Sequence, residues 1–131
     1  MRGEMPAFDG RRMRIAGAPG SVAFGGGEST AAMLTLSPGQ WKLEAKGWAN
    51  WSVSGSLQWC GMYLRLNNPT TGPLADSIQI TYPFTEGAIP FALLAVIAVA
   101  TPTTVYLNGA PSHPGTGTQL LNAGVLVATP V

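Results

Sequence analysis

Alternation between apolar and polar side chains with a period of two recurs along the chain, and this is typical of β-strands with one buried face. It is clearest from Trp41 to Ala49. The apolar face carries Trp41, Leu43, Ala45 and Ala49, and the polar face carries Lys42, Glu44 and Lys46. We expect one face to be buried and the other wet, as in an antiparallel sheet. The preceding Pro38-Gly39 pair predicts a tight turn, because proline fixes φ and glycine accepts a positive φ.

A second stretch, Ile89–Ala100, is apolar at every position and therefore on both alternating faces. Such a run is typical of a buried helix or of a strand covered on both sides. Its neighbours favour a strand: Pro90 lies near its start, Thr101-Pro102-Thr103 follow its end, and Thr104–Leu107 is rich in β-branched and aromatic residues. We predict a long central strand covered on both faces, a tight turn and a second strand.

Further strands are predicted over Ala31–Ser37, Leu57–Leu66, Ser77–Tyr82 and Gln119–Thr129. In the last of these, which the pattern allows as one strand or two, Leu121, Ala123, Val125 and Val127 are expected on one face. Loops are predicted over Asn67–Pro73, Pro83–Ala88 and Asn108–Thr118, and Asn50–Ser56 is expected to be a loop or an edge strand. About eight short strands without a convincing helix predict an all-β fold, an antiparallel β-sandwich or jelly roll.

Residues 1–30 differ from the rest, because they contain scattered apolar residues, many glycines and no steady alternation. We interpret them as an extended N-terminal arm and residues 31–131 as the jelly-roll domain. The first 14 residues have a net charge of +2, from four arginines against Glu4 and Asp9. The arm could fold back along its own domain, but such anchors also suit docking on a neighbouring subunit. The residues expected to contact a partner are Phe8, Arg11, Arg12, Met13, Arg14 and Ile15.

Composition changes this picture in one respect. Charged residues make up only 10% of the 131 residues, against about 25% in typical globular domains. Partner subunits that cover much of the surface would explain this low content of charged residues, and so would a compositional habit of the source genome.

The net charge of +1 predicts no general attraction to nucleic acid or to an anionic membrane. The single cysteine, Cys60, excludes an intrachain disulfide and a cysteine-based zinc site, and we expect it to be a small buried side chain.

The strand at Leu57–Leu66 points to a subunit interface. Cys60, Met62, Leu64 and Leu66 form one face and are expected in the core. Trp59, Tyr63 and Arg65 form the other, where a solvated strand would carry threonine, lysine or glutamate. These three residue types are enriched at protein interfaces, so we predict an oligomer contact here, with cover by a loop as the alternative.

No catalytic arrangement stands out. His113 is the single histidine and has no acidic neighbour in sequence, so neither a triad nor a metal site is expected. We therefore expect no enzymatic activity, no metal and no cofactor. Trp48 and Trp51, together with His113, form a candidate ligand surface, because exposed tryptophans stack on sugar rings. The alternative is that the tryptophans pack inside the domain or in a trimer interface.

The order of these elements resembles that of C1q/TNF-like jelly rolls, particularly the small versions in structural proteins of tailed bacteriophages. The resemblance covers about residues 31–131 and rests on three stretches: L-T-L-S-P-G-Q-W-K-L-E-A-K at 34–46, A-V-I-A-V-A-T-P-T-T-V-Y-L at 95–107 and L-L-N-A-G-V-L-V-A-T at 120–129. In that family a pGxWxLxA strand opens the domain, and a tVyL strand precedes a variable loop. The resemblance implies a compact homotrimer packed on one sheet and serving as a virion component.

We therefore expect a non-enzymatic virion structural protein, assembled in the host cytoplasm. In this hypothesis a capsid decoration trimer, joined through Trp59 and Tyr63, is anchored by its arm to neighbouring subunits such as the major capsid protein. The alternative is a tail-fibre or spike protein that binds a receptor or carbohydrate through its exposed tryptophans and the 108–118 loop. A secreted lectin or adhesin is a weaker alternative, because the first residues lack the apolar core of a signal peptide.

Overall fold

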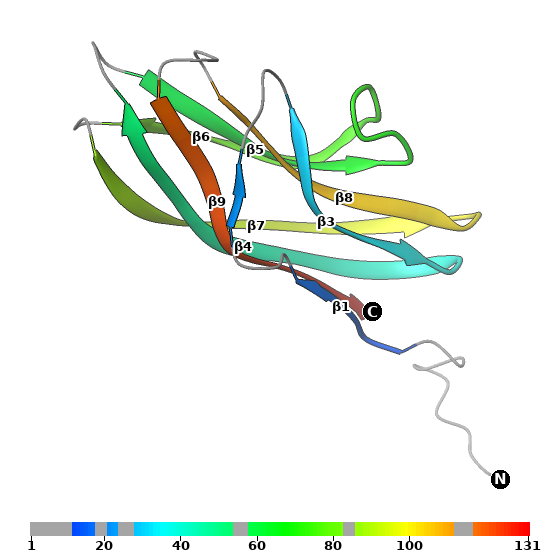
Figure 1. The fold of residues 1–131 in the computed structure, drawn as a ribbon. Helices are drawn as coiled ribbons and strands as arrows, with labels where there is room; N and C mark the ends of the chain where they lie inside the picture. The colour runs from blue at the N-terminus through cyan, green and yellow to red at the C-terminus, as the bar shows by residue number, and fades with distance from the viewer. Residues whose placement is uncertain (1–11, 18–20, 24–27, 54–57, 83–85, 112–116) are drawn as a thin grey trace, which may run out of the picture.

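The computed structural model describes residues 12–17, 21–23, 28–53, 58–82, 86–111 and 117–131. These residues form β-strands joined by turns (Figure 1). The strands are β1 (Arg14–Gly17), β2 (Ser21–Ala23), β3 (Ser29–Leu36), β4 (Gly39–Val53), β5 (Gln58–Leu66), β6 (Leu74–Tyr82), β7 (Glu86–Val99), β8 (Thr103–Pro111) and β9 (Gly117–Pro130). The described part of the chain contains no helix of the length and apolarity that crossing a bilayer requires.

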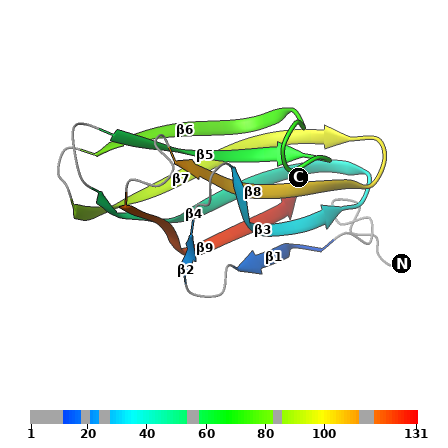
Figure 2. The same cartoon turned by 45° about the horizontal axis from the view of Figure 1, so that its top comes forward.

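The strands form two antiparallel sheets that pack face to face (Figure 2). One sheet has the order β1-β9-β4-β7, with β2 also paired to β9, and we call it the β7 sheet. The other has the order β3-β8-β5-β6, and we call it the β5 sheet. The predicted all-β sandwich or jelly roll is confirmed.

The core lies between the two sheets and follows the predicted alternation on β4 and β5. Trp41 is almost fully buried, and its indole Nε1 donates a hydrogen bond of 2.9 Å to the carbonyl oxygen of Ser37. The other large side chains that are fully buried come from both sheets: Leu36, Leu43, Met62, Leu64, Leu107, Leu121 and Leu126. Cys60 is buried as expected. The Pro38-Gly39 turn is also confirmed, since Gly39 has a φ of 139° that other residues rarely adopt.

The prediction of a central strand covered on both faces is wrong for Ile89–Ala100. The segment is a strand, but β7 is the edge strand of its sheet and only its odd-numbered residues face the core. Pro90 fits this position, since an edge strand tolerates a residue that cannot donate to a neighbouring strand. The sequence does not reveal that β7 is an edge strand, because the outward residues of this strand are as apolar as its inward residues.

The prediction that Leu121, Ala123, Val125 and Val127 share one face is also wrong. Leu121 faces the core, but beyond it the buried residues are Gly124, Leu126 and Ala128. The cause is a β-bulge: the pairing with β4 shifts between Lys46 and Trp48, so that two residues of β9 oppose Gly47 alone. One extra residue reverses the alternation, because side chains on a strand alternate with a period of two.

Several strands extend further than predicted. Asn50–Val53 continue β4, Glu86–Ala88 begin β7, and Asn108–Pro111 end β8 rather than opening a loop. Asn108 is fully buried, so the 108–118 segment is not an exposed loop at its start. Part of the predicted arm belongs to the sandwich as well, because β1 and β2 pair with β9 and Ser29-Thr30 open β3.

Candidate functional site

An uninterrupted row of exposed apolar residues covers the outward side of β7. Its most prominent members are Leu94 and Val96, each 59% exposed. The whole row, which we call the β7 row, comprises Ala88, Pro90, Ala92, Leu94, Val96, Ala98 and the adjoining Ala100. An exposed apolar edge strand promotes association with other chains, so proteins usually cover it or blunt it with charges. The β7 row carries no charge.

The outer face of the β7 sheet has a strip of charged residues at its centre, with the β7 row along one side of the strip and further apolar residues along the other. On β4 the outward residues Lys42, Glu44 and Lys46 are exposed, and Lys42 Nζ lies 3.6 Å from Glu44 Oε1. Register places Leu94 on one side of Glu44 and Val127 on the other. Ile15, beside Val127 on β1, is 63% exposed. The face therefore has apolar margins on both sides of three charges.

A shallow depression of about 530 Å³ lies on this face. It is lined by Lys46, Gly47, Trp48, Pro90, Phe91, Ala92 and Val125. Trp48 is 46% exposed at its border, whereas Trp51 is 5% exposed and packs in the core. Trp51 therefore does not belong to the candidate ligand surface, and His113 lies outside the described residues.

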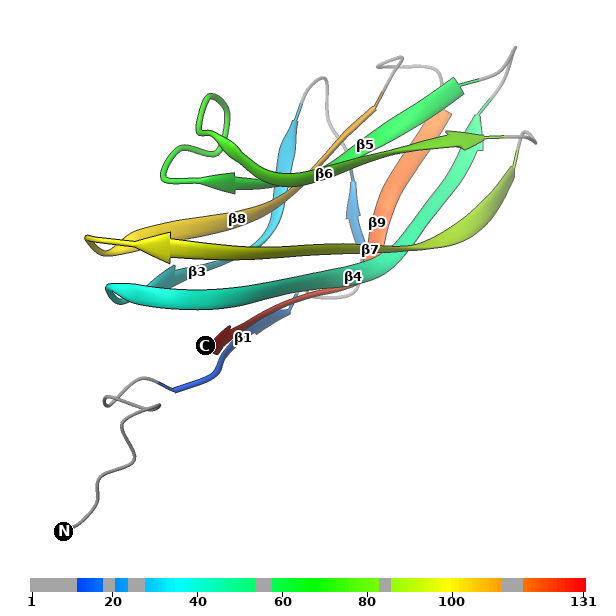
Figure 3. The same cartoon turned by 180° about the vertical axis from the view of Figure 1, so that it is seen from behind.

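The carboxylate of Asp76, on β6, links the two sheets at the side of the sandwich where β7 lies. β6 and β7 are the outermost strands of their sheets here and lie side by side (Figure 3). Asp76 Oδ2 accepts a hydrogen bond of 2.9 Å from the Leu94 backbone N–H, and Asp76 Oδ1 accepts one of 2.9 Å from the Ser77 N–H. Asp76 thereby occupies a backbone donor of the edge strand, which discourages a further strand from pairing there.

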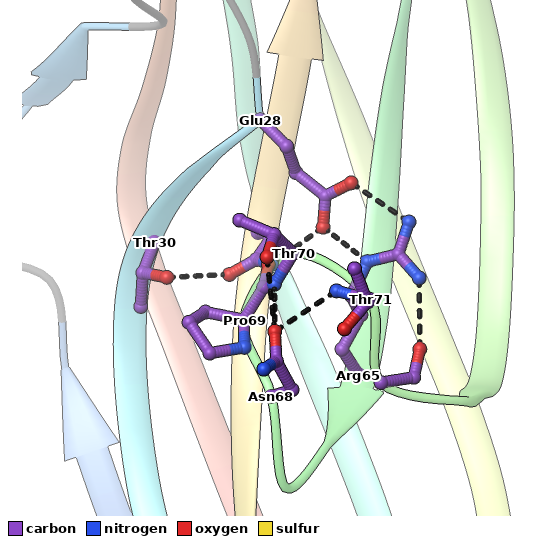
Figure 4. A network of polar contacts seen from close by, with 9 residues as sticks. Glu28, Thr30, Arg65, Asn68, Pro69, Thr70 and Thr71 are labelled. Atoms are coloured by element: carbon purple, nitrogen blue, oxygen red, sulfur yellow. Dashed lines mark hydrogen bonds and ion pairs between the residues drawn. The ribbon is translucent and has the colours of Figure 1, made fainter.

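A network of polar contacts covers part of the outer face of the β5 sheet (Figure 4). Arg65 donates to the Glu28 carboxylate through Nε at 2.5 Å and Nη2 at 2.9 Å, and through Nη1 to the Gly72 carbonyl at 2.8 Å. The buried Asn108 donates to Glu28 Oε2 at 2.5 Å and to the Pro69 carbonyl at 2.7 Å. Thr30 donates to Asn108 Oδ1 at 2.8 Å. We call this set the Glu28 network; it ties the start of β3 to β5, β8 and the 67–73 loop.

The predicted interface residues Trp59, Tyr63 and Arg65 lie in or near this network. Trp59 is 37% exposed, while Tyr63 and Arg65 are half-buried. The Tyr63 ring lies over Gly61, where a Cβ would meet the phenol oxygen, and the Arg65 guanidinium carbon is 5.5 Å from the ring centroid. Burial raises the pKa of Tyr63, and the hydrogen bonds to Glu28 raise the pKa of Arg65. Arg65 is thus engaged within its own chain.

The partner-contact residues predicted on the arm expose their side chains where the structure describes them. Arg12, Met13, Arg14 and Ile15 are all exposed, although the backbone of Arg14–Gly17 pairs with β9. Phe8 and Arg11 lie outside the described residues.

Sequence reasoning missed the β7 row, Asp76 and Glu28. Pro90 was the available signal for the first, because proline inside a strand indicates an edge. No sequence signal links Glu28 to Arg65, which lie 37 positions apart.

No group of His, Cys, Asp and Glu side chains that could hold a metal ion occurs among the described residues. The most distinctive feature of the described surface is the outer face of the β7 sheet, where apolar margins flank three charges. No protein-family model matches the sequence, and no curated protein matches it.

Proposed function

We propose that the protein is a non-enzymatic structural subunit of a virion, a homotrimer that decorates and cements a phage capsid. The β7 row is the observation that carries the proposal. Leu94 and Val96 expose most of their apolar surface in the single chain, and five further apolar residues continue the row. Burying the exposed part of such side chains contributes about 1–2 kcal/mol each, so the row favours association. The 10% content of charged residues supports the same proposal.

The β7 sheet supports the trimer contact better than the predicted surface at Trp59 and Tyr63. Arg65 already pairs with Glu28, and the polar 67–73 loop covers part of the β5 sheet. The β7 sheet instead offers Leu94, Val96 and the depression beside Trp48. The β5 sheet is then the outer surface of the trimer.

The N-terminal arm attaches the trimer to the shell in this proposal. Arg12 and Arg14 supply positive charge, and Met13 and Ile15 supply exposed apolar side chains. A groove in the major capsid protein with apolar walls and acidic residues at its rim fits this combination. Several arms on one trimer bind the shell together and so bind it more tightly than one arm would.

Immunogold labelling of purified particles tests the proposal. An antibody against the protein is expected to label the heads of virions at many regularly spaced positions. Controls are particles whose gene for this protein has been deleted. Particles without label would overturn the virion role.

The receptor-binding alternative has one observation in its favour, the exposed Trp48 at the border of the depression. A tryptophan face beside a lysine could stack on a sugar ring and hydrogen-bond its hydroxyls. Label confined to tail tips would support this alternative and contradict capsid decoration.

A further inference from the structure

We propose that the outer face of the β5 sheet holds a binding site for a neutral oligosaccharide, centred on Trp59 and Tyr63. The site, which we call the β5 platform, comprises Trp59, Gly61 and Tyr63 on β5 and Ser77, Gln79 and Thr81 on β6. This inference goes beyond the proposed function and does not depend on it, because all six residues belong to one chain. In the proposed trimer the β5 sheet faces outward, so the platform is accessible there as well.

The two aromatic side chains of the platform lie in one row along β5. Side chains alternate between the two faces of a strand, so Trp59, Gly61 and Tyr63 project to the same side. Positions 59 and 63 are about 13 Å apart at roughly 3.3 Å per residue. This distance is longer than one sugar ring, so the row suits a short oligosaccharide better than a single sugar.

The Tyr63 ring lies back over Gly61, toward Trp59. A Cβ on Gly61 would clash with the Tyr63 hydroxyl and with the ring, so only glycine leaves room for this position. The Arg65 guanidinium carbon is 5.5 Å from the ring centroid, and Arg65 is itself held by Glu28. A ligand therefore meets a tyrosine that is already ordered, which lowers the entropy cost of binding.

Strand β6 supplies uncharged polar groups beside this row. The register pairs Trp59, Gly61 and Tyr63 with Thr81, Gln79 and Ser77, respectively. Paired residues project to the same face, and the three residues of β6 are all exposed. Hydroxyl and amide groups can both donate and accept hydrogen bonds, as the hydroxyl groups of a sugar do.

This combination of side chains fits a neutral sugar. The face of an aromatic ring carries partial negative charge and attracts the C–H groups on the apolar side of a sugar ring. The hydroxyl groups at the rim of the sugar can then bind the polar side chains of β6. Arg65 is the next outward residue of β5, but the Glu28 carboxylate already binds its guanidinium, so it does not favour an anionic ligand.

The size of the platform also favours a small ligand. A row of about 13 Å across two strands spaced by about 4.8 Å covers roughly 130 Å². A stable protein interface takes roughly 800 Å² per partner. The Glu28 network borders the platform at Tyr63, and β6 is the edge of the sheet on one side.

Binding of the full-length protein to an array of neutral hexose and N-acetylhexosamine oligosaccharides tests the platform. The wild-type protein is expected to bind, and calorimetric titration with the tightest-bound soluble oligosaccharide gives its Kd. Trp59→Ala is expected to weaken this binding about tenfold, because it removes one aromatic face. Gly61→Ala is expected to weaken it too, since the added methyl group displaces the Tyr63 hydroxyl while both aromatic side chains remain. Thermal unfolding of each variant checks the fold.

Trp48→Ala is the matched control, because Trp48 is an exposed tryptophan on the opposite sheet. It is expected to bind the oligosaccharide as tightly as the wild-type protein does. Weaker binding of Trp48→Ala together with unchanged binding of Trp59→Ala would place the sugar in the depression on the β7 sheet and overturn the platform.

The remaining outcomes separate the platform from the proposed function. A wild-type protein that binds no oligosaccharide on the array, or only charged glycans added to it, would overturn the platform even if the antibody labels virions. If no glycan bound and Trp59→Ala lowered the labelling of virions, the same surface would be a protein contact and not a sugar site. Sugar binding that depends on Trp59 would stand even if virions carried no label.

Discussion

Replacing both Leu94 and Val96 with lysine is expected to convert the assembled protein to monomers without unfolding it. Both side chains are 59% exposed, so the substitutions create no cavity in the core. In the proposed trimer each contact loses two buried apolar side chains and gains two desolvated charges. At about 1 kcal/mol or more per side chain, and with the desolvation of the two lysines in addition, association weakens more than about 30-fold. Sedimentation velocity over a range of protein concentrations measures the change.

A matched control is available on the opposite sheet. Met33 and Leu74 are exposed by 59% and 47%, and they lie on β3 and β6 of the β5 sheet. The Met33→Lys/Leu74→Lys variant adds the same charge and is expected to associate as the wild-type protein does. If the control dissociated and the Leu94→Lys/Val96→Lys variant did not, the β5 sheet would be the interface and our assignment would be reversed.

Arg65→Met is expected to destabilise the fold by about 3 kcal/mol, because it leaves the largely buried Glu28 carboxylate without its cation. The side chains of Arg65 and Glu28 are only 18% and 15% exposed. The substitution also removes the hydrogen bond to the Gly72 carbonyl that holds the 67–73 loop. For a chain of this size the melting temperature should fall by roughly 10 °C, measured at one fixed protein concentration.

The double variant Glu28→Gln/Arg65→Met shows whether the cost comes from the isolated charge. It is expected to be more stable than Arg65→Met alone, since glutamine carries no charge and keeps an acceptor for Asn108. A melting temperature of Arg65→Met within about 1 °C of the wild-type value would show that the Glu28 network contributes little to the fold.

The sequence predicted the fold class because alternation is strong where one face is buried and the other polar. Trp41–Ala49 is the best example, and its two faces lie as expected. The same reasoning failed on β7, where both faces are apolar and alternation carries no information about which face is covered. It also failed on β9, because the alternation was read straight through a bulge opposite Gly47, although Gly124 inside the strand is the kind of residue that marks one.

The candidate site was less predictable than the fold. Trp59, Tyr63 and Arg65 share a face as expected, but composition could not show that Arg65 pairs with Glu28. Exposed leucine and valine on an edge strand have the same sequence signature as buried ones. The surface that we propose as the interface became visible only when the sheet order placed β7 at an edge.

The molecular mass of the purified full-length protein in solution tests the central claim most directly. Sedimentation equilibrium at several concentrations should give three times the 13.6 kDa of one chain, with dissociation only on dilution. A mass of 13.6 kDa at every concentration, up to the millimolar range, would contradict the claim that the β7 row is buried between copies.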